Sequence, residues 1–311
     1  MRGKVIVYRD QEELAERFSE ALMERITFSG EGKYAKEGNY AKEGNPGIAW
    51  EGRYDIAISG GSTPQIVFSV LASKYADSPL WENTHFWWVD ERMVPPDHPD
   101  SNFGVANRLL FSKISIPEKN IHRIKGENEP YDEAADYAKQ IFSEVPGYNY
   151  RTATADESGN CCGSAAQESN VSGGENNGFG DDKNGSGRDK VAPDVTKVNG
   201  RPVFDLVILG LGDDGHTASI FPDQMELLNS DLICAVAHHP VTGQARVTLT
   251  GKQINKALAV NFLVTGSNKA ERLSEIALEG EKSKLLPASY IHPVNGELFW
   301  YCDAAAVQIL P

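Results

Sequence analysis

The chain has 311 residues, 40% of them hydrophobic, and its 44 acidic residues against 30 basic ones give a formal net charge of −14 at neutral pH. This length can bury one large α/β core, and the acidic balance argues against nucleic acid or an anionic membrane as a partner. The N-terminal residues 1–10 are too short and too polar for a signal peptide, and no apolar run approaches the length of a membrane span. We therefore expect a cytoplasmic protein.

The first expected element is a helix that begins near Asp10. Asp10 and Glu13 have the spacing of a capping box. The residues that follow place an apolar stripe on one side of this helix, formed by Leu14, Phe18, Leu22 and Ile26. A polar hexapeptide then occurs twice, at residues 34–39 and 40–45. Two copies are too few for a repeat architecture, so we interpret them as an expansion within a surface loop.

The next region reads as a strand over residues 55–58, a glycine turn, and a helix with Pro64 at its first position. The turn combines two glycines with two hydroxyl side chains: Gly60, Gly61, Ser62 and Thr63. Free backbone N–H groups and the helix dipole both favour an anion at such a helix start, so the turn is a candidate phosphate site. The spacing is not that of a P-loop. The alternative is a tight turn that is simply capped by Ser62 or Thr63.

A second strand begins at residue 86 and ends in the charged residues 90–92. Asp90 and Arg92 flank Glu91, and Asn102 follows shortly afterwards. Arg92 can bind phosphate or carboxyl oxygens with both arms of its planar guanidinium. The alternative is a surface ion pair between Glu91 and Arg92.

A helix is expected over residues 131–145, and the stretch from about 147 to 202 departs from the pattern of a folded domain. It is rich in Gly, Ser, Asn and Asp and contains almost no large apolar residues. Such a segment cannot bury enough surface to offset its ordering entropy. We therefore predict a single domain over residues 1–311 with a flexible insert at about 147–202.

The run over residues 206–209 is apolar without alternation, which is typical of a strand buried on both faces of a parallel sheet. It leads into a glycine turn that presents three polar side chains: Asp213, Asp214 and His216. We predict a helix directly after this turn, capped by Thr217 or Ser219, so that His216 would lie beside free N–H groups. Read alone, such a histidine is as readily a satisfied loop residue as a catalytic group, and the pattern leaves open which aspartate orients it.

Two later segments add positive charge. Arg246 lies within an expected strand over residues 244–250, and Lys269 follows a buried strand over 258–264 near the start of a helix. Singly each is an ordinary solvated charge, but with Arg92 they form a cationic set in an acidic protein. The cysteines have no disulfide or zinc spacing and are expected to be free thiols: Cys161, Cys162, Cys234 and Cys302.

Taken together, these motifs resemble the 6-phosphogluconolactonases in order and spacing, over nearly the whole chain except the insert. The matching segments are residues 60–64, 90–92, 100–102, 210–222 and 246–249. The resemblance implies a Rossmann-like, doubly wound α/β fold, with a mainly parallel sheet flanked by helices, that is shared with sugar-phosphate isomerases. It also implies a carboxylic ester hydrolase that converts 6-phosphoglucono-1,5-lactone to 6-phosphogluconate in the oxidative pentose phosphate pathway, without metal or cofactor.

In this interpretation His216 is the general base and Asp214 its orienting partner. The small sugar-phosphate substrate would be bound by Gly60, Gly61, Ser62, Thr63, Asp90, Arg92, Asn102, Arg246 and Lys269. Two alternatives remain: a glucosamine-6-phosphate deaminase-like isomerase, and a non-catalytic sugar-phosphate sensor. A monomer is the expected oligomeric state.

Overall fold

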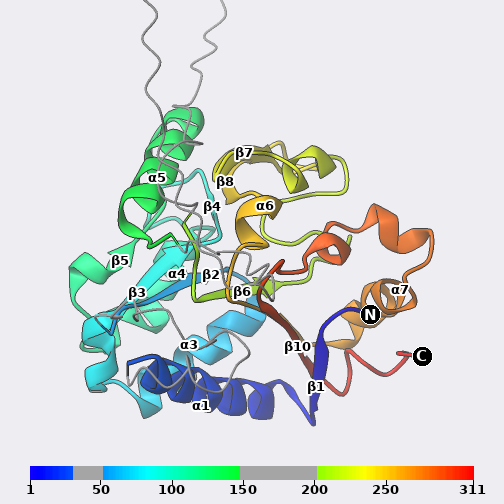
Figure 1. The fold of residues 1–311 in the computed structure, drawn as a ribbon, viewed down its shortest axis with the longest axis horizontal. Helices are drawn as coiled ribbons and strands as arrows, with labels where there is room; N and C mark the ends of the chain where they lie inside the picture. The colour runs from blue at the N-terminus through cyan, green and yellow to red at the C-terminus, as the bar shows by residue number, and fades with distance from the viewer. Residues whose placement is uncertain (31–51, 148–201) are drawn as a thin grey trace, which may run out of the picture. The chain divides into compact units, whose positions relative to one another are not determined.

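The computed structural model describes residues 1–30, 52–147 and 202–311, and its main element is a parallel sheet (Figure 1). The strand order is β1-β10-β9-β6-β2-β3-β5, and every neighbouring pair is parallel. The strands are β1 (Lys4–Tyr8), β2 (Tyr54–Ile58), β3 (Thr84–Trp88), β5 (Ile121–His122), β6 (Leu206–Gly210), β9 (Ala259–Val264) and β10 (Glu297–Asp303). The strands expected near 55–58, 86–89, 206–209 and 258–264 are thus confirmed, within one sheet.

Helices cover both faces of this sheet. They are α1 (Gln11–Gly30), α3 (Ser62–Lys74), α4 (Asn102–Leu109), α5 (Pro130–Glu144), α6 (Gly251–Ile254) and α7 (Ala270–Leu278). Short 3-10 turns connect them: η1 (Pro79–Asn83), η2 (Phe111–Lys113), η3 (Glu118–Asn120), η4 (Met225–Leu228), η5 (Ser267–Lys269), η6 (Lys282–Leu285) and η7 (Pro287–Tyr290).

The side chains of β3 show which helix lies on which face. Phe86 packs against Phe111 of η2, whereas its neighbour Trp87 packs against Tyr137 of α5. Because successive side chains of a strand point to opposite faces, α5 lies on the face opposite to η2 and the adjoining α4. Helix α3 contacts both α1 and α4, and Figure 1 shows α1 and α3 side by side. The expected doubly wound arrangement is confirmed.

The first helix follows the sequence pattern closely. Oδ1 of Asp10 accepts the backbone N–H of Glu13 at 2.8 Å, and the Glu13 carboxylate reaches back to the N–H of Arg9 at 2.9 Å. The predicted apolar stripe is buried along its length: Leu14, Phe18, Leu22 and Ile26.

A second, three-stranded sheet was not predicted. It has the order β4-β8-β7, is antiparallel, and comprises β4 (Asp90–Arg92), β7 (Cys234–His238) and β8 (Ala245–Leu249). The single strand expected to run from 86 into 92 is therefore two strands in different sheets. Val89 lies at the junction, because its N–H donates to Ile58 O at 2.9 Å while its carbonyl accepts from Leu249 N at 2.7 Å. This change of sheet places Arg92 directly opposite Arg246.

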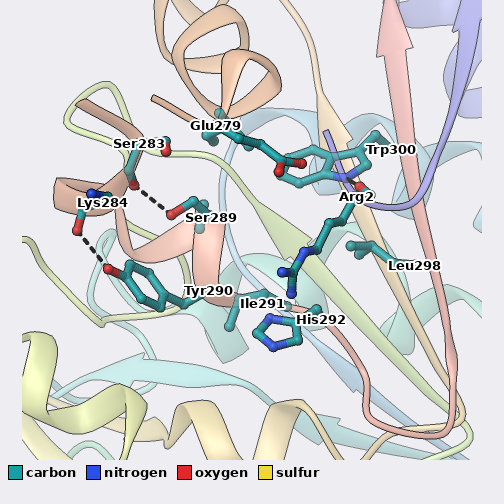
Figure 2. A pocket seen from close by; sticks show the side chains of 12 residues that line it. Arg2, Glu279, Ser283, Lys284, Ser289, Tyr290, Ile291, His292, Leu298 and Trp300 are labelled. Carbon is teal, nitrogen blue, oxygen red and sulfur yellow. Dashed lines mark hydrogen bonds between the residues drawn. The ribbon is translucent and has the colours of Figure 1, made fainter. Parts of the chain in front are cut away.

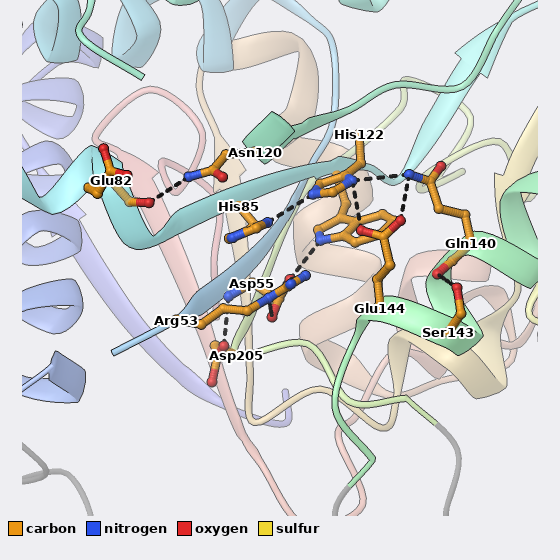
Figure 3. A network of polar contacts seen from close by, with 11 residues as sticks. Arg53, Asp55, Glu82, His85, Asn120, His122, Gln140, Ser143, Glu144 and Asp205 are labelled. Atoms are coloured by element: carbon orange, nitrogen blue, oxygen red, sulfur yellow. Dashed lines mark hydrogen bonds and ion pairs between the residues drawn. The ribbon is translucent and has the colours of Figure 1, made fainter. Parts of the chain in front are cut away.

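Near the N-terminal ends of the strands, a buried polar network joins β2, β3 and β5 (Figure 3). Arg53 forms two hydrogen bonds to Asp55, at 2.7 and 2.8 Å, and Trp87 Nε1 donates to the same carboxylate at 2.8 Å. Nδ1 of His85 lies 2.9 Å from Nε2 of His122. Burial, followed by the charge of Arg53, lowers the pKa of His85 to about 4, and burial together with His85 lowers the pKa of His122 to about 3. Both rings are therefore neutral in the folded protein near pH 7.

Several predictions fall outside the described residues, namely the hexapeptide copies, Cys161 and Cys162, and residues 148–201 of the insert. The ends of the insert are described: Gly147 pairs with Pro202 in an antiparallel bridge, and Val203 N–H donates to Pro146 O at 3.0 Å. The other two cysteines, Cys234 and Cys302, are confirmed as free, buried thiols. In the described part of the chain, none of the helices combines the length and apolar character needed to cross a bilayer.

Candidate active site

The candidate residues gather where β9, β6, β2 and β3 end, because these strands are parallel neighbours. The carboxyl ends of parallel strands meet at one edge of a sheet, where α/β proteins bind ligands. Hydrogen bonds join the loops there. Ser59 Oγ donates to Ile208 O at 2.9 Å, and the hydroxyls of Thr63 and Thr265 lie 2.7 Å apart.

The turn after β6 holds an aspartate-histidine pair. Nδ1 of His216 lies 2.5 Å from Oδ1 of Asp214, which also accepts the backbone N–H of His216 at 3.1 Å. Asp213 is engaged elsewhere: it pairs with Lys269 and accepts from Asn268 Nδ2 at 2.9 Å. Of the two aspartates left open by the sequence, Asp214 is therefore the one that contacts the imidazole.

The protonation of this pair follows from its geometry. Burial opposes ionisation of Asp214, but the hydrogen bond and charge of His216 outweigh it and bring the pKa of Asp214 to about 2. At neutral pH the carboxylate is ionised and can only accept, so Nδ1 of His216 carries the proton. Nε2 then presents its lone pair, and the His216 side chain keeps 28% of its surface exposed.

Gly212 is a steric requirement of this pair. A Cβ at Gly212 would lie 2.1 Å from Nδ1 of His216 and 2.7 Å from Oδ1 of Asp214. The absence of a side chain at Gly212 therefore leaves room for the imidazole.

The helix predicted directly after His216 is wrong. Thr217 pairs with Ile220 in an isolated bridge, and Ala218 between them has a positive φ of 54°. The Thr217 hydroxyl donates to Gly210 O at 2.9 Å, and the next helix in the chain is η4. Neither Thr217 nor Ser219 is a cap, and no helix start lies at His216, because these hydroxyls close the loop onto neighbouring strands instead.

Arg92 and Arg246 form a pair of guanidinium groups without an acidic partner among the described residues. They lie opposite each other in β4 and β8, where directly opposed side chains share one face of the sheet. Arg92 Nη1 donates to the carbonyl of Asp100 at 2.8 Å, and Nε of each arginine has no hydrogen-bond partner. Within the described ranges, neither has a carboxylate within ion-pair distance.

Burial makes this pair a strong candidate for binding an anion. Arg246 is only 8% exposed, and burial lowers the pKa of its guanidinium, although Asp90 partly offsets the effect. A buried charge without a counterion is costly. An anionic ligand bound between the two arginines would therefore be stabilised strongly, and phosphate suits the planar fork.

Glu91 does not form the ion pair with Arg92 that was the alternative interpretation. Its buried carboxylate accepts the N–H groups of Asn102 at 2.8 Å and Phe103 at 2.7 Å and the hydroxyl of Ser101 at 3.0 Å, all at the start of α4. Burial raises the pKa of Glu91, and these hydrogen bonds oppose the rise. The sequence did not predict that Glu91 binds the start of α4, because a glutamate between two charged residues is typical of an exposed segment.

The start of α3 differs from that of α4, because a glycine stands at its N-cap. Its N-cap is Gly61, with a φ of 108°, and no side-chain hydrogen bond caps the helix. The alternative in which Ser62 or Thr63 caps the turn is therefore wrong. The first N–H groups of α3 remain available for an anion, unlike those of α4.

Asp90 and Asn102 connect the glycine turn to Arg246. Asn102 Nδ2 donates to Asp90 O at 2.9 Å, and a Cβ on Gly60 would lie 1.9 Å from Asn102 Oδ1. Oδ2 of Asp90 accepts the hydroxyl of Ser219 at 2.6 Å, and Ser219 Oγ accepts from Arg246 Nη1 at 3.3 Å. Asp90 and Asn102 are buried and bound to protein groups, so they position the site. Ser219, absent from the predicted binding set, completes this link.

Phe221 brings the two halves of the site together. Its buried ring lies 4.8 Å from the ring of His216 and 5.4 Å from the guanidinium carbon of Arg246. The imidazole and the guanidinium therefore flank one fixed side chain and lie within reach of one small ligand. Lys269, by contrast, is paired with Asp213, so its charge is already neutralised.

A separate cavity of about 390 Å³ lies beside α7 and β10 (Figure 2). Arg2, Tyr290 and His292 are among its lining residues, and none of the candidate residues is. A backbone hydrogen bond joins its wall to the histidine turn, where Ala288 N–H donates to Gly215 O at 3.1 Å. We therefore place the candidate site by the Asp214–His216 pair and the two arginines rather than by this cavity.

Known proteins are similar to this chain over most of its length. Residues 34–157 and 178–300 match the family model for glucosamine-6-phosphate isomerases/6-phosphogluconolactonase. The chain is 38% identical to the 6-phosphogluconolactonase of Haemophilus influenzae over 256 residues, 82% of this chain and 87% of that one, and 31% identical to the human 6-phosphogluconolactonase, over 83% and 81%. Among solved structures, a devB protein has a TM-score of 0.71 at 32% identity, covering 98% of both chains. The 6-phosphogluconolactonase from Trypanosoma brucei also has a TM-score of 0.71 but only 23% identity, with 100% and 99% covered, so it speaks for the fold.

Proposed function

The chain belongs to the family of glucosamine-6-phosphate isomerases and 6-phosphogluconolactonases, and on this basis we propose that it hydrolyses 6-phosphoglucono-1,5-lactone to 6-phosphogluconate. The reaction is a carboxylic ester hydrolysis in the oxidative pentose phosphate pathway. The observation that carries the proposal is the Asp214–His216 pair, whose imidazole lies beside the same buried ring as Arg246.

Arg92 and Arg246 bind the phosphate of the substrate. Their guanidinium groups are opposed across β4 and β8 without a carboxylate partner in the described structure, and the uncapped start of α3 adds N–H donors. Ser62 and Thr63 lie in the first turn of that helix. Lys269 contributes less to phosphate binding than the sequence suggested, because Asp213 already neutralises it.

His216 is the general base. Nε2 takes a proton from a water molecule while the water oxygen forms a bond to the lactone carbonyl carbon. When the tetrahedral intermediate collapses, the bond from that carbon to the ring oxygen breaks, and the imidazolium returns the proton to the departing oxygen. The product acid then loses its proton to solvent. Asp214 holds Nδ1–H throughout and stabilises the imidazolium, because it stays ionised at neutral pH.

Anchoring the phosphate increases the rate of this step. A bound phosphate fixes one end of the substrate, so the lactone carbonyl is held near Nε2 rather than sampling other positions. The deaminase alternative shares the family model and the fold, the latter through a monomeric glucosamine-6-phosphate deaminase with a TM-score of 0.61 and 16% identity. The lactonase proposal has in addition relatives named 6-phosphogluconolactonase at 38% and 36% identity. The sensor alternative does not account for an imidazole held in its basic tautomer by a carboxylate.

The test is a steady-state assay with freshly generated lactone, corrected for spontaneous ring opening. His216→Ala is expected to lower kcat by roughly 10²- to 10⁴-fold, the range for loss of a general base, with a smaller change in KM. His292→Ala, an exposed histidine away from the site, serves as the control and should behave as the unmodified chain. Near-normal turnover by His216→Ala would remove this residue as the base, and binding of 6-phosphogluconate without any hydrolysis would favour the sensor.

A further inference from the structure

We infer that His239 is a substrate-binding residue, whose Nε2–H donates a hydrogen bond to the phosphate that Arg92 and Arg246 attract. The inference rests on the proposed function and extends it. His239 lies in the hairpin that joins β7 to β8, directly after the last residue of β7, and Arg246 is the second residue of β8. One hairpin therefore carries both side chains.

The tautomer of His239 is fixed by its own hairpin. The backbone N–H groups of Val241 and Thr242 both donate to Nδ1, each at 3.2 Å. A neutral imidazole has one acceptor and one donor nitrogen, so the proton is on Nε2. The two ring nitrogens face nearly opposite directions, and Nε2 therefore points away from the hairpin turn. In the described part of the chain, no group accepts a hydrogen bond from Nε2.

Contacts with Phe221 place this donor at the site. The His239 ring meets the Phe221 ring edge to face, with centroids 5.4 Å apart and an interplanar angle of 73°. The same buried ring is flanked by the guanidinium of Arg246 at 5.4 Å and the ring of His216 at 4.8 Å. Three polar groups, from two separate chain segments, thus surround one immobile side chain.

The hairpin is held rigidly against the segment that follows Phe221. Gln224 Nε2 donates to His238 O at 2.7 Å, and Gln224 Oε1 accepts the N–H of His238 at 2.9 Å. His239 N–H donates to Gln244 O at 3.0 Å, which closes the base of the turn. A donor on such a frame loses little entropy when it binds, so it contributes to affinity.

The charges around His239 favour the phosphate end of the substrate. Burial lowers the pKa of His239 first, then Arg246 and His216, with Arg92 adding to the effect and Asp214 opposing it. Cations therefore dominate its surroundings, and an anion between them would relieve their mutual repulsion. A dianionic phosphate provides oxygens for both arginines and for Nε2–H together.

The test uses three variants. His239→Ala is expected to raise KM by about tenfold, the equivalent of one lost hydrogen bond to a charged group, while kcat stays within about threefold. His239→Gln places an amide N–H near the position of Nε2 and should recover most of the affinity. His238→Ala changes the exposed neighbouring side chain and leaves its backbone bonds to Gln224 in place, so it should show unchanged KM.

Inorganic phosphate, as a competitive inhibitor, identifies the contacted group. If His239 binds phosphate, the inhibition constant of phosphate rises in His239→Ala by about the same factor as KM. An unchanged inhibition constant of phosphate in His239→Ala would overturn the inference. This holds if KM is also unchanged, and it holds if KM rises, because His239 would then contact a sugar hydroxyl instead of the phosphate. A fall in kcat at constant KM would also overturn it. Absence of lactone hydrolysis by the unmodified chain would instead refute the proposed function, and calorimetric titration of 6-phosphogluconate would still report on His239.

Discussion

The stability of the folded chain should depend on pH through the His85–His122 pair. In the folded chain the pKa of His85 is about 4 and the pKa of His122 is about 3, both below the ordinary histidine value of 6.5. Between pH 6.5 and those folded values the unfolded chain binds more protons, so the free energy of unfolding falls as the pH is lowered. The contribution of the pair is complete above about pH 6.5 and is lost progressively towards pH 4 and below.

The magnitude follows from these pKa values. At about pH 5 each unfolded histidine is protonated and each folded one is neutral, which corresponds to roughly 2 kcal/mol per residue by linkage. His85 is only partly buried, and the Glu144 carboxylate 3.3 Å from Nδ1 of His122 favours the imidazolium. Both effects reduce the total, so we expect about 2 kcal/mol for the pair rather than about 4.

Urea unfolding at about pH 7.5 and about pH 5 measures this difference. In the double variant His85→Asn with His122→Gln, amides replace the contacting nitrogens without a titratable group, and most of the pH dependence should disappear. His292→Gln, which changes an exposed histidine, should retain it. If the unmodified chain were equally stable at both pH values, or if the double variant kept the full dependence, the neutral buried pair would be refuted.

Three further changes test the site. Gly212→Ala places a Cβ against Nδ1 of His216 and should lower kcat by about 100-fold with the fold intact by circular dichroism; unchanged turnover would show that the imidazole can move freely. Asp214→Asn removes the ionised acceptor of Nδ1–H and should lower kcat by at least about tenfold with little change in KM, whereas a change in KM alone would make Asp214 a binding residue. Gly60→Ala meets Oδ1 of Asn102 and should chiefly raise KM by displacing the phosphate turn, by about tenfold; wild-type KM, measured by the same assay, would contradict that.

The sequence could predict four of the seven strands of the main sheet, β2, β3, β6 and β9, and the residues at its edge, because both depend on local patterns. Apolar runs without alternation identify buried parallel strands. Because the carboxyl ends of parallel strands meet at one edge of a sheet, Arg92 is then expected near the turn of His216. The antiparallel sheet was missed because β4 has only three residues, Asp90–Arg92, and owes its existence to pairing with a strand distant in the chain. Short strands of this kind carry no periodic signal.

Residue type was a poor guide wherever contacts between distant parts of the chain determine what a side chain binds. Thr217 and Ser219 have the residue types of helix caps, but their hydroxyls bind Gly210 O and Asp90 instead. Lys269 was grouped with the arginines, and the folded chain adds that it forms an ion pair with Asp213, so its part in phosphate binding stays a prediction. Such pairings between distant residues have no signature in one sequence.

The bridge between Gly147 and Pro202 holds together the two residues that flank residues 148–201. Lengthening a flexible segment whose ends are fixed in this way has a small effect on stability, because each doubling of its length adds only about 0.6 kcal/mol to the entropic free energy of closure. Evolution can therefore lengthen, shorten or replace this segment while helix α5 before it and strand β6 after it stay in place. An engineered reporter domain whose own termini lie close together could be spliced there for the same reason.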